Sequence, residues 1–231
     1  SSALRNPTSS ISLFFKDRLP RTRDIISQVN GELRGATILK PDGQVDYSLI
    51  GTAFHYRLCF YFKNCDPRTF SAWSGAQLAS GRGFLPNRTV ERFFEECLST
   101  VNKFRPKSLR LARTKEVQLL QLCYILACFE QFDRRGTDIN SPLKMLKQDL
   151  TTSKLLKFVP DTIVEDLLKL SYVAYDRWRK QFRSRTFLNP TFCGPNYLNA
   201  QADLIVKQCL WEVKTTISSN IQAIWLYQLL S

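Results

Sequence analysis

The sequence predicts a mixed α/β fold, in which a small core sheet is flanked by helices and interrupted by a large, mainly helical insertion. Three observations lead to this expectation. Apolar residues recur at helical spacing through the middle of the chain, two short apolar runs near residue 205 are typical of paired strands, and 44% hydrophobic with 23% charged residues is a globular composition. We expect a single domain over 1–231, with core motifs at 48–64 and 186–231 and the helical insertion at about 88–185.

The first half of the chain predicts helices separated by loops. After a loose leader, the expected elements are a short helix from Ser9 or Ser10 to Leu19, a strand at 37–39, a turn at Pro41-Asp42-Gly43, a buried helix at 47–62 and a Gly-, Ser- and Pro-rich loop at 65–87.

The second half predicts a helical block followed by strands. Its expected elements are helices at 89–104, 115–132 and 161–182, the last capped by Asp161, strands at 202–206 and 209–215, and a final amphipathic helix from Ser218 or Ser219. The final helix breaks off abruptly at Ser231, so we expect the natural protein to continue beyond it.

The charge balance indicates a polyanionic partner. The chain has 33 Lys and Arg against 20 Asp and Glu, a net charge of +13. The surplus is concentrated in residues 103–115 and 177–185, and nucleic acid and an anionic membrane surface are the obvious partners. Each segment alone also fits a solvated helix end or loop. The candidate nucleic-acid-binding residues are Arg105, Lys107, Arg110, Arg113, Arg177, Arg179, Lys180, Arg183 and Arg185.

Several classes of site are excluded. A zinc site built on several histidines is excluded because His55 is the only histidine, and no G-x-x-x-x-G-K-[ST] phosphate-binding loop occurs. No apolar run is long enough for a membrane span or a signal peptide. The seven cysteines form no C-x-x-C pair and most lie in apolar surroundings, which favours a reducing, cytoplasmic compartment.

The most informative segment extends from Ala202 to Lys214. If Lys207-Gln208 is the two-residue turn of a β-hairpin, Asp203 lies opposite Glu212 with Cβ atoms about 5 Å apart. Lys214 shares the face of Glu212 because side chains alternate along a strand. Two facing carboxylates repel each other, and a Mg²⁺ or Mn²⁺ ion between them removes this repulsion. Lys214 can then position an attacking water, as in metal-assisted phosphodiester hydrolysis.

A structural interpretation of the same residues stays open. Asp203 can end its strand and bind backbone, while Glu212 and Lys214 form a surface pair. Lys-Gln is also a poor hairpin turn, since Asn-Gly or Asp-Gly is preferred.

An acid followed by apolar residues, and then Glu-x-Lys on the next strand, resembles the PD-(D/E)XK nuclease superfamily. Gly51-Thr52-Ala53-Phe54-His55 is similar to the G-x-x-x-H signature of its RecB-like branch, although a lone histidine among apolar residues is more often part of a core. Tyr227-Gln228 resembles the start of the Q-x-x-x-Y motif, and Gln222 is the other candidate for its glutamine.

The resemblance implies a restriction-endonuclease-like core and a role for each matching residue. Asp203, Glu212, the Val213 carbonyl and His55 would hold the metal, Lys214 would position the water, and Gln228 would contact substrate or support the lysine. The cysteines depart from the iron–sulfur pattern of some relatives, so no cluster is expected.

We therefore expect a Mg²⁺- or Mn²⁺-dependent nuclease that acts on DNA, with RNA as an alternative substrate and no membrane partner. The competing hypotheses are a non-catalytic nucleic-acid-binding or assembly module with a degenerate nuclease fold, and a helical protein–protein adaptor.

Overall fold

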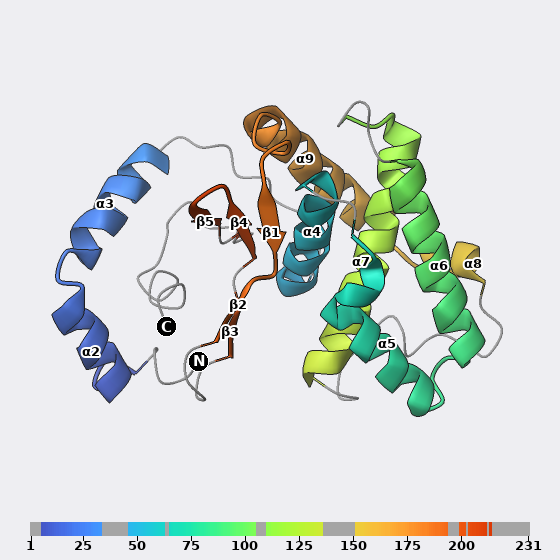
Figure 1. Cartoon of the computed structure of the whole chain (residues 1–231), viewed down its shortest axis with the longest axis horizontal. Coiled ribbons are helices and arrows are strands. Elements are labelled where there is room, and N and C mark those ends of the chain that lie inside the picture. The colour runs from blue at the N-terminus through green and yellow to red at the C-terminus, as the bar shows by residue number, and fades with distance from the viewer. Residues whose placement is uncertain are drawn as a thin grey trace. The chain divides into compact units, whose positions relative to one another are not determined.

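A computed structural model gives the fold of the chain (Figure 1). The structure describes residues 6–33, 46–62, 65–104, 110–135, 151–193, 199–201, 203–211 and 213.

Helices account for most of the described residues. They are α2 (Ser10–Arg18), α3 (Thr22–Leu33), α4 (Tyr47–Phe62), the short 3-10 helix η1 (Pro67–Thr69), α5 (Ser71–Gly81), α6 (Asn87–Lys103), α7 (Arg113–Arg135), α8 (Thr152–Leu156) and α9 (Asp161–Trp178). The strands are β1 (Thr186–Leu188), β2 (Thr191–Cys193), β3 (Asn199–Gln201), β4 (Leu204–Val206) and β5 (Cys209–Trp211).

The chain divides into two compact units. The helical unit comprises residues 41–188 and 206–208, and the terminal unit comprises residues 1–40, 189–205 and 209–231. The expectation of a single domain stays a prediction.

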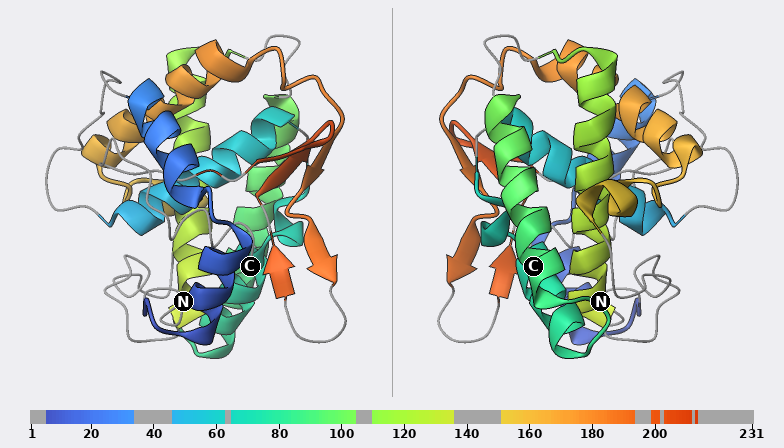
Figure 2. Two further views of the ribbon diagram at one scale, coloured as in Figure 1. Left: turned by 90° about the vertical axis from the view of Figure 1, so that its left-hand side faces the viewer. Right: turned by 90° about the vertical axis from the view of Figure 1, so that its right-hand side faces the viewer.

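The core of the helical unit is built around α4. This helix is apolar on nearly its whole circumference, and such a helix must be covered on several sides. It packs against α7 and α9, while α5 packs against α7 (Figures 1 and 2). Phe93 and Phe94 of α6 meet Phe129 of α7 in an aromatic cluster, with ring centroids 5.4–6.0 Å apart.

The strands form two small sheets. The three-stranded sheet has the order β1-β4-β5, and the two-stranded sheet pairs Thr191 with Gln201 and Cys193 with Asn199 in antiparallel register. A backbone hydrogen bond lies at each end of the β1–β4 pairing. The Lys207 N–H donates to the Arg185 carbonyl at 2.9 Å, and the Asn189 N–H donates to the Asp203 carbonyl at 3.0 Å. β4 is the central strand, and its Leu204 and Val206 are buried.

The expected mixed α/β fold with a restriction-endonuclease-like core sheet flanked by helices is wrong. The described part of the chain is mainly helical and has no core sheet flanked by helices, because each of its strands is three residues long. The apolar surface is buried instead between α4, α5, α6, α7 and α9. Within the 202–206 and 209–215 patterns, β4 and β5 do form, but they are too short to form a layer of the core.

Several individual elements match their expectation. The helices expected from Ser9 or Ser10, at 47–62, at 89–104 and at 115–132 are present, and the Ser9 side chain caps α2 by accepting from the Ser12 N–H. The helix expected at 161–182 is α9, but Pro160 occupies its cap position in place of Asp161. The strand expected at 37–39 and the helix expected from Ser218 or Ser219 lie outside the described residues.

The loop expected at 65–87 is wrong, because residues 71–81 form α5. The small residues that suggested a loop are those with which α5 packs tightly: Ala72, Gly75, Ala76 and Ala79 are all buried. Helices α3 and α8 were not anticipated. Among the described helices, none has both the length and the apolar character needed to cross a membrane.

Candidate functional site

The β4–β5 hairpin turns at Lys207-Gln208, as the spacing predicts. Lys207 makes this turn with a backbone φ of +58°, in the left-handed region that a non-glycine residue adopts at a cost of about 1 kcal/mol. The backbone N–H of Lys207 donates to the carbonyl of Arg185, so the neighbouring strand supports the strained residue. A poor turn sequence is therefore tolerated because the sheet supports it.

Asp203 stands at the beginning of this hairpin. Its side chain is partly exposed, and its Oδ2 accepts a hydrogen bond from the Val213 N–H at 2.6 Å. This bond joins the residue before β4 to the backbone of a residue after β5, which is consistent with the two-residue turn between the strands. The bond also corresponds to the structural interpretation of Asp203, in which the carboxylate binds backbone at the end of its strand.

The other residues of the proposed centre are described only in part. Val213 is present through its N–H bond to Asp203, and its predicted carbonyl role stays a prediction. Glu212, Lys214, Gln222 and Gln228 lie outside the described residues.

His55 lies in the middle of α4, in the helical unit, whereas Asp203 belongs to the terminal unit. The His55 side chain is partly exposed, and its Nε2 lies 3.5 Å from Sγ of Cys59, one helical turn further along. The Tyr56 ring is 5.9 Å away, centroid to centroid. These contacts fit a histidine packed into a helical core, and its role as a metal ligand stays a prediction.

A divalent metal needs several oxygen donors. Within the described residues, no group of three or more His, Cys, Asp or Glu side chains could hold a metal. On the hairpin, Asp203 supplies a carboxylate of the type that Mg²⁺ and Mn²⁺ bind, and Glu212 would have to supply the second.

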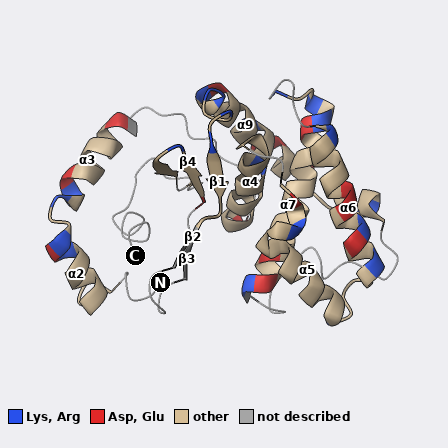
Figure 3. Ribbon diagram, in the orientation of Figure 1, with Lys and Arg blue, Asp and Glu red and all other residues tan. Residues whose placement is uncertain are grey.

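The two basic segments lie on the helical unit, at the N-terminal end of α7 and the C-terminal end of α9. Figure 3 shows Lys and Arg, in blue, at this end of α9. We call the exposed cations at these two helix ends the basic surface, which comprises Arg110, Arg113, Lys115, Arg177, Arg179, Lys180, Arg183 and Arg185. The candidates Arg105 and Lys107 lie outside the described residues.

Direct contacts join the two segments. The Arg113 guanidinium forms an ion pair with Glu165 of α9, and the Arg110 guanidinium lies 5.1 Å from the ring centroid of Tyr172. Phe182, which the sequence places among the basic residues, is buried and stacks on Tyr61 with centroids 4.5 Å apart. Phe182 is therefore part of the core and is not available to a nucleic acid.

A buried ionic cluster joins three helices and was not predicted from the sequence. Arg57 and Glu116 are almost fully buried and form a bidentate pair, with N–O distances of 2.7 and 2.9 Å. The Ser171 hydroxyl donates to Glu116, and the Tyr61 hydroxyl lies 2.8 Å from Ser171 Oγ. The signal was present in the sequence, since Arg57 is a lone cation in an apolar helix and must find an anion.

Burial and the neighbouring charge shift the pKa values of Arg57 and Tyr61 in opposite directions. Burial alone would lower the pKa of Arg57, but the Glu116 carboxylate more than offsets it and the pKa is raised. Burial raises the pKa of Tyr61 from 10.0 to about 12, although the charge of Arg57 opposes the rise. Arg57 therefore stays charged and Tyr61 stays neutral at physiological pH, so the cluster joins α4, α7 and α9 without exchanging protons.

Comparison with protein-family models, curated proteins and solved structures found no match for this chain. The resemblance to the PD-(D/E)XK superfamily therefore stays a prediction that depends on the quoted motifs.

Proposed function

We propose that the protein is a metal-dependent nuclease whose centre is built on the β4–β5 hairpin. The observation that carries the proposal is the hydrogen bond from the Val213 N–H to Asp203 Oδ2. It supports a register in which the residue opposite Asp203 is Glu212, two positions before Lys214. The proposal depends on this local geometry and does not require the core sheet that the sequence predicts.

Each residue has a defined task in the proposed reaction. Asp203 and Glu212 would hold the metal, and the Val213 N–H orients the Asp203 carboxylate. Bound Mg²⁺ or Mn²⁺ would supply Lewis acidity toward the scissile phosphate. The Lys214 ammonium would hold the attacking water and offset the charge that develops on the phosphate oxygens. His55 and Gln228 stay candidates for completing the metal shell and contacting substrate.

The proposed substrate is DNA, in a cytoplasmic setting. The net charge of +13 and the exposed basic surface support a polyanionic substrate. RNA is the alternative, because phosphate contacts alone do not distinguish the two.

The decisive variant is Asp203→Asn, because its amide oxygen can still accept from the Val213 N–H while the negative charge is lost. We expect plasmid cleavage in Mn²⁺ or Mg²⁺ to fall by about 100-fold or more in Asp203→Asn and in Lys214→Ala. Matched controls are Asp17→Asn and Lys157→Ala, which change exposed residues elsewhere and should cleave like the wild type.

A second readout separates metal binding from turnover. Mn²⁺ should raise the melting temperature of the wild type and of the Asp17→Asn control, and should leave that of Asp203→Asn unchanged. Equal cleavage by wild type, Asp203→Asn and Lys214→Ala would refute the catalytic centre.

A non-catalytic nucleic-acid-binding module is the second candidate. The same bond between Asp203 and Val213 favours it, because a carboxylate engaged by backbone can have a purely structural role. Salt-sensitive DNA binding without metal-dependent cleavage, and without a Mn²⁺ effect on melting, would support this candidate.

A further inference from the structure

The cations at the N-terminal end of α7 contact one row of residues on α9. Arg113 contacts Glu165, and Arg110 contacts Tyr172 seven residues further along α9. Seven residues are about two helical turns, so this row of α9 continues at Arg179, about 10 Å beyond Tyr172. Arg179 keeps a right-handed helical backbone at the end of α9, so the row extends to it. The cations at the N-terminal end of α7 therefore lie along the row of α9 that leads to Arg179.

The composition of the basic surface favours phosphate groups. Six of its eight cations are arginines, and the planar guanidinium matches phosphate oxygens with two parallel hydrogen bonds. Glu165 is neutralised by Arg113, and Asp176 is an exposed acid on the same row. The Arg57–Glu116 pair lies buried beneath, so Glu116 adds no negative charge to the surface.

An exposed aromatic ring adjoins the cations. Phe187 of β1 is 49% exposed, and the Arg185 guanidinium lies 5.2 Å from its ring centroid. A ring of this kind beside a cation can stack on a nucleobase that is not already stacked within a duplex. Phosphate contacts from the cations and base stacking on Phe187 are the two components of single-strand binding.

We infer that the basic surface, together with Phe187, binds single-stranded nucleic acid. This surface includes none of the proposed catalytic residues Asp203, Glu212 and Lys214, so it can bind whether or not the protein cleaves. It deepens the proposed function by naming the form of the substrate that the protein holds.

The test measures binding of a fluorescent single-stranded oligonucleotide by anisotropy in EDTA, where metal-dependent cleavage cannot occur. Affinity is measured over a range of salt concentrations. Each phosphate contact to a single strand contributes about −0.7 to the slope of log K against log salt. The triple variant Arg179→Gln, Lys180→Gln, Arg183→Gln should therefore bind more weakly, with a slope smaller by about 2.

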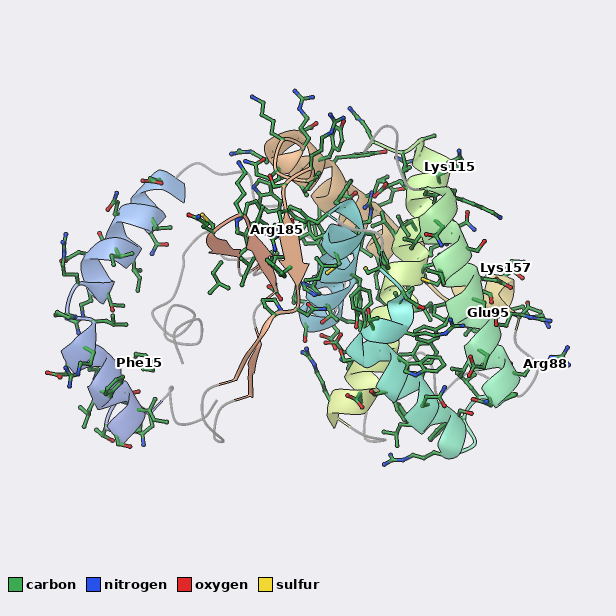
Figure 4. The ribbon with its side chains drawn as sticks, in the orientation of Figure 1. Phe15, Arg88, Glu95, Lys115, Lys157 and Arg185 are labelled. Carbon is green, nitrogen blue, oxygen red and sulfur yellow. The ribbon has the colours of Figure 1, made fainter. Side chains whose placement is uncertain are left out.

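A matched triple variant controls for net charge. Arg88→Gln, Arg92→Gln, Lys157→Gln also removes three positive charges, from exposed positions on α6 and directly after α8. In Figure 4, Arg88 and Lys157 lie on the α6–α8 side of the helical unit, away from Arg185. The control should keep the wild-type salt slope. If both triple variants lose equal affinity and slope, binding follows net charge alone and the site is refuted.

Two single variants test the remaining parts of the surface. Phe187→Ala should weaken single-strand binding by about tenfold while leaving duplex binding unchanged. Asp176→Asn should strengthen binding, because it removes an exposed negative charge from the row. Unchanged single-strand affinity in Phe187→Ala would refute the stacking component.

Two of the variants distinguish nucleic-acid binding at this surface from cleavage at the hairpin and from binding to a membrane. Asp203→Asn should bind the oligonucleotide like the wild type, so loss of the catalytic proposal would leave this inference intact. Stronger binding to vesicles of anionic phospholipid than to the oligonucleotide, abolished by the α9 triple variant, would instead assign the surface to a membrane and overturn the inference.

Discussion

Arg57 and Glu116 illustrate how single residues connect elements that are distant in sequence. Their charges are almost fully removed from water, and both carboxylate oxygens of Glu116 are engaged by the guanidinium. Ser171 donates to the same carboxylate, and the Tyr61 ring lies 3.4 Å from the guanidinium carbon. Desolvation of each ion is costly, so the pair is tolerated only because all of these partners are present together.

Glu116→Gln should destabilise the protein by about 3 kcal/mol, because it leaves the Arg57 charge buried without a counterion. Urea unfolding followed by circular dichroism measures the loss. Glu95→Gln is the matched control: Glu95 is 69% exposed and lies 3.9 Å from Arg68, so the change should cost less than about 1 kcal/mol. Replacing both partners, as in Arg57→Met with Glu116→Leu, should cost less than Glu116→Gln alone. Wild-type stability in Glu116→Gln would contradict this account.

At the scale of elements, the close packing of α5 on α7 depends on a glycine. A Cβ at position 75 would overlap the carbonyl oxygen of Phe129 and lie 2.7 Å from its carbonyl carbon. The contact is with backbone, which cannot rotate away, so the two helices would have to separate. Gly81, at the end of the same helix, has open space around its Cα.

Gly75→Ala should therefore lower the free energy of unfolding by about 1–3 kcal/mol, as expected for overpacking in a well-filled core. Gly81→Ala is the matched control, and it should be neutral or stabilising by up to about 1 kcal/mol because alanine favours the helix. Thermal melting of the two variants beside the wild type makes the comparison. Equal melting temperatures for all three proteins would show that the helices can shift at no cost.

Three neighbouring helices show where prediction from the sequence succeeds and where it fails. Periodic apolar residues predict α6 and α7, because a helix with one large apolar face has a distinctive pattern. The pattern fails for α5, whose buried face consists of small residues that also occur in loops. The hairpin turn could be predicted from spacing, whereas the partner of Asp203 could not, since two interpretations of its carboxylate fitted the same sequence.

At the scale of the whole molecule, buried phenols and thiols predict sensitivity to alkali. Burial raises the pKa of Tyr61 to about 12, and burial also raises the pKa values of Tyr56, Cys97 and Cys128. Each group stays protonated in the folded state at a pH where the unfolded chain has lost its proton. The stabilising contribution is complete below the unfolded pKa and is lost as the pH rises toward the folded pKa.

We therefore expect the free energy of unfolding to fall steadily between pH 9 and pH 11, the range above the ordinary pKa of the thiols and around that of the phenols. Urea titrations at a series of pH values measure the slope. Tyr61→Phe should make the slope shallower near and above pH 10, because one titrating group is removed. A stability that is flat or rises over this range would contradict the burial of these groups.

The fold class could not be predicted because it depends on which apolar faces meet. The sequence around residues 202–215 does favour strands, and β4 and β5 form within it, but a strand of three residues buries little surface. α4 is apolar on most of its circumference, so both α7 and α9 pack against it. Which helices pack against α4 depends on how the whole unit assembles, and no local sequence pattern indicates it.

The Arg57–Glu116 pair also has a consequence for how this protein can diverge. Loss of either charge alone is costly, whereas replacing both by apolar side chains is tolerated better, so neither position can drift independently. In related sequences, positions 57 and 116 should change together, with Ser171 lost where the acid is lost.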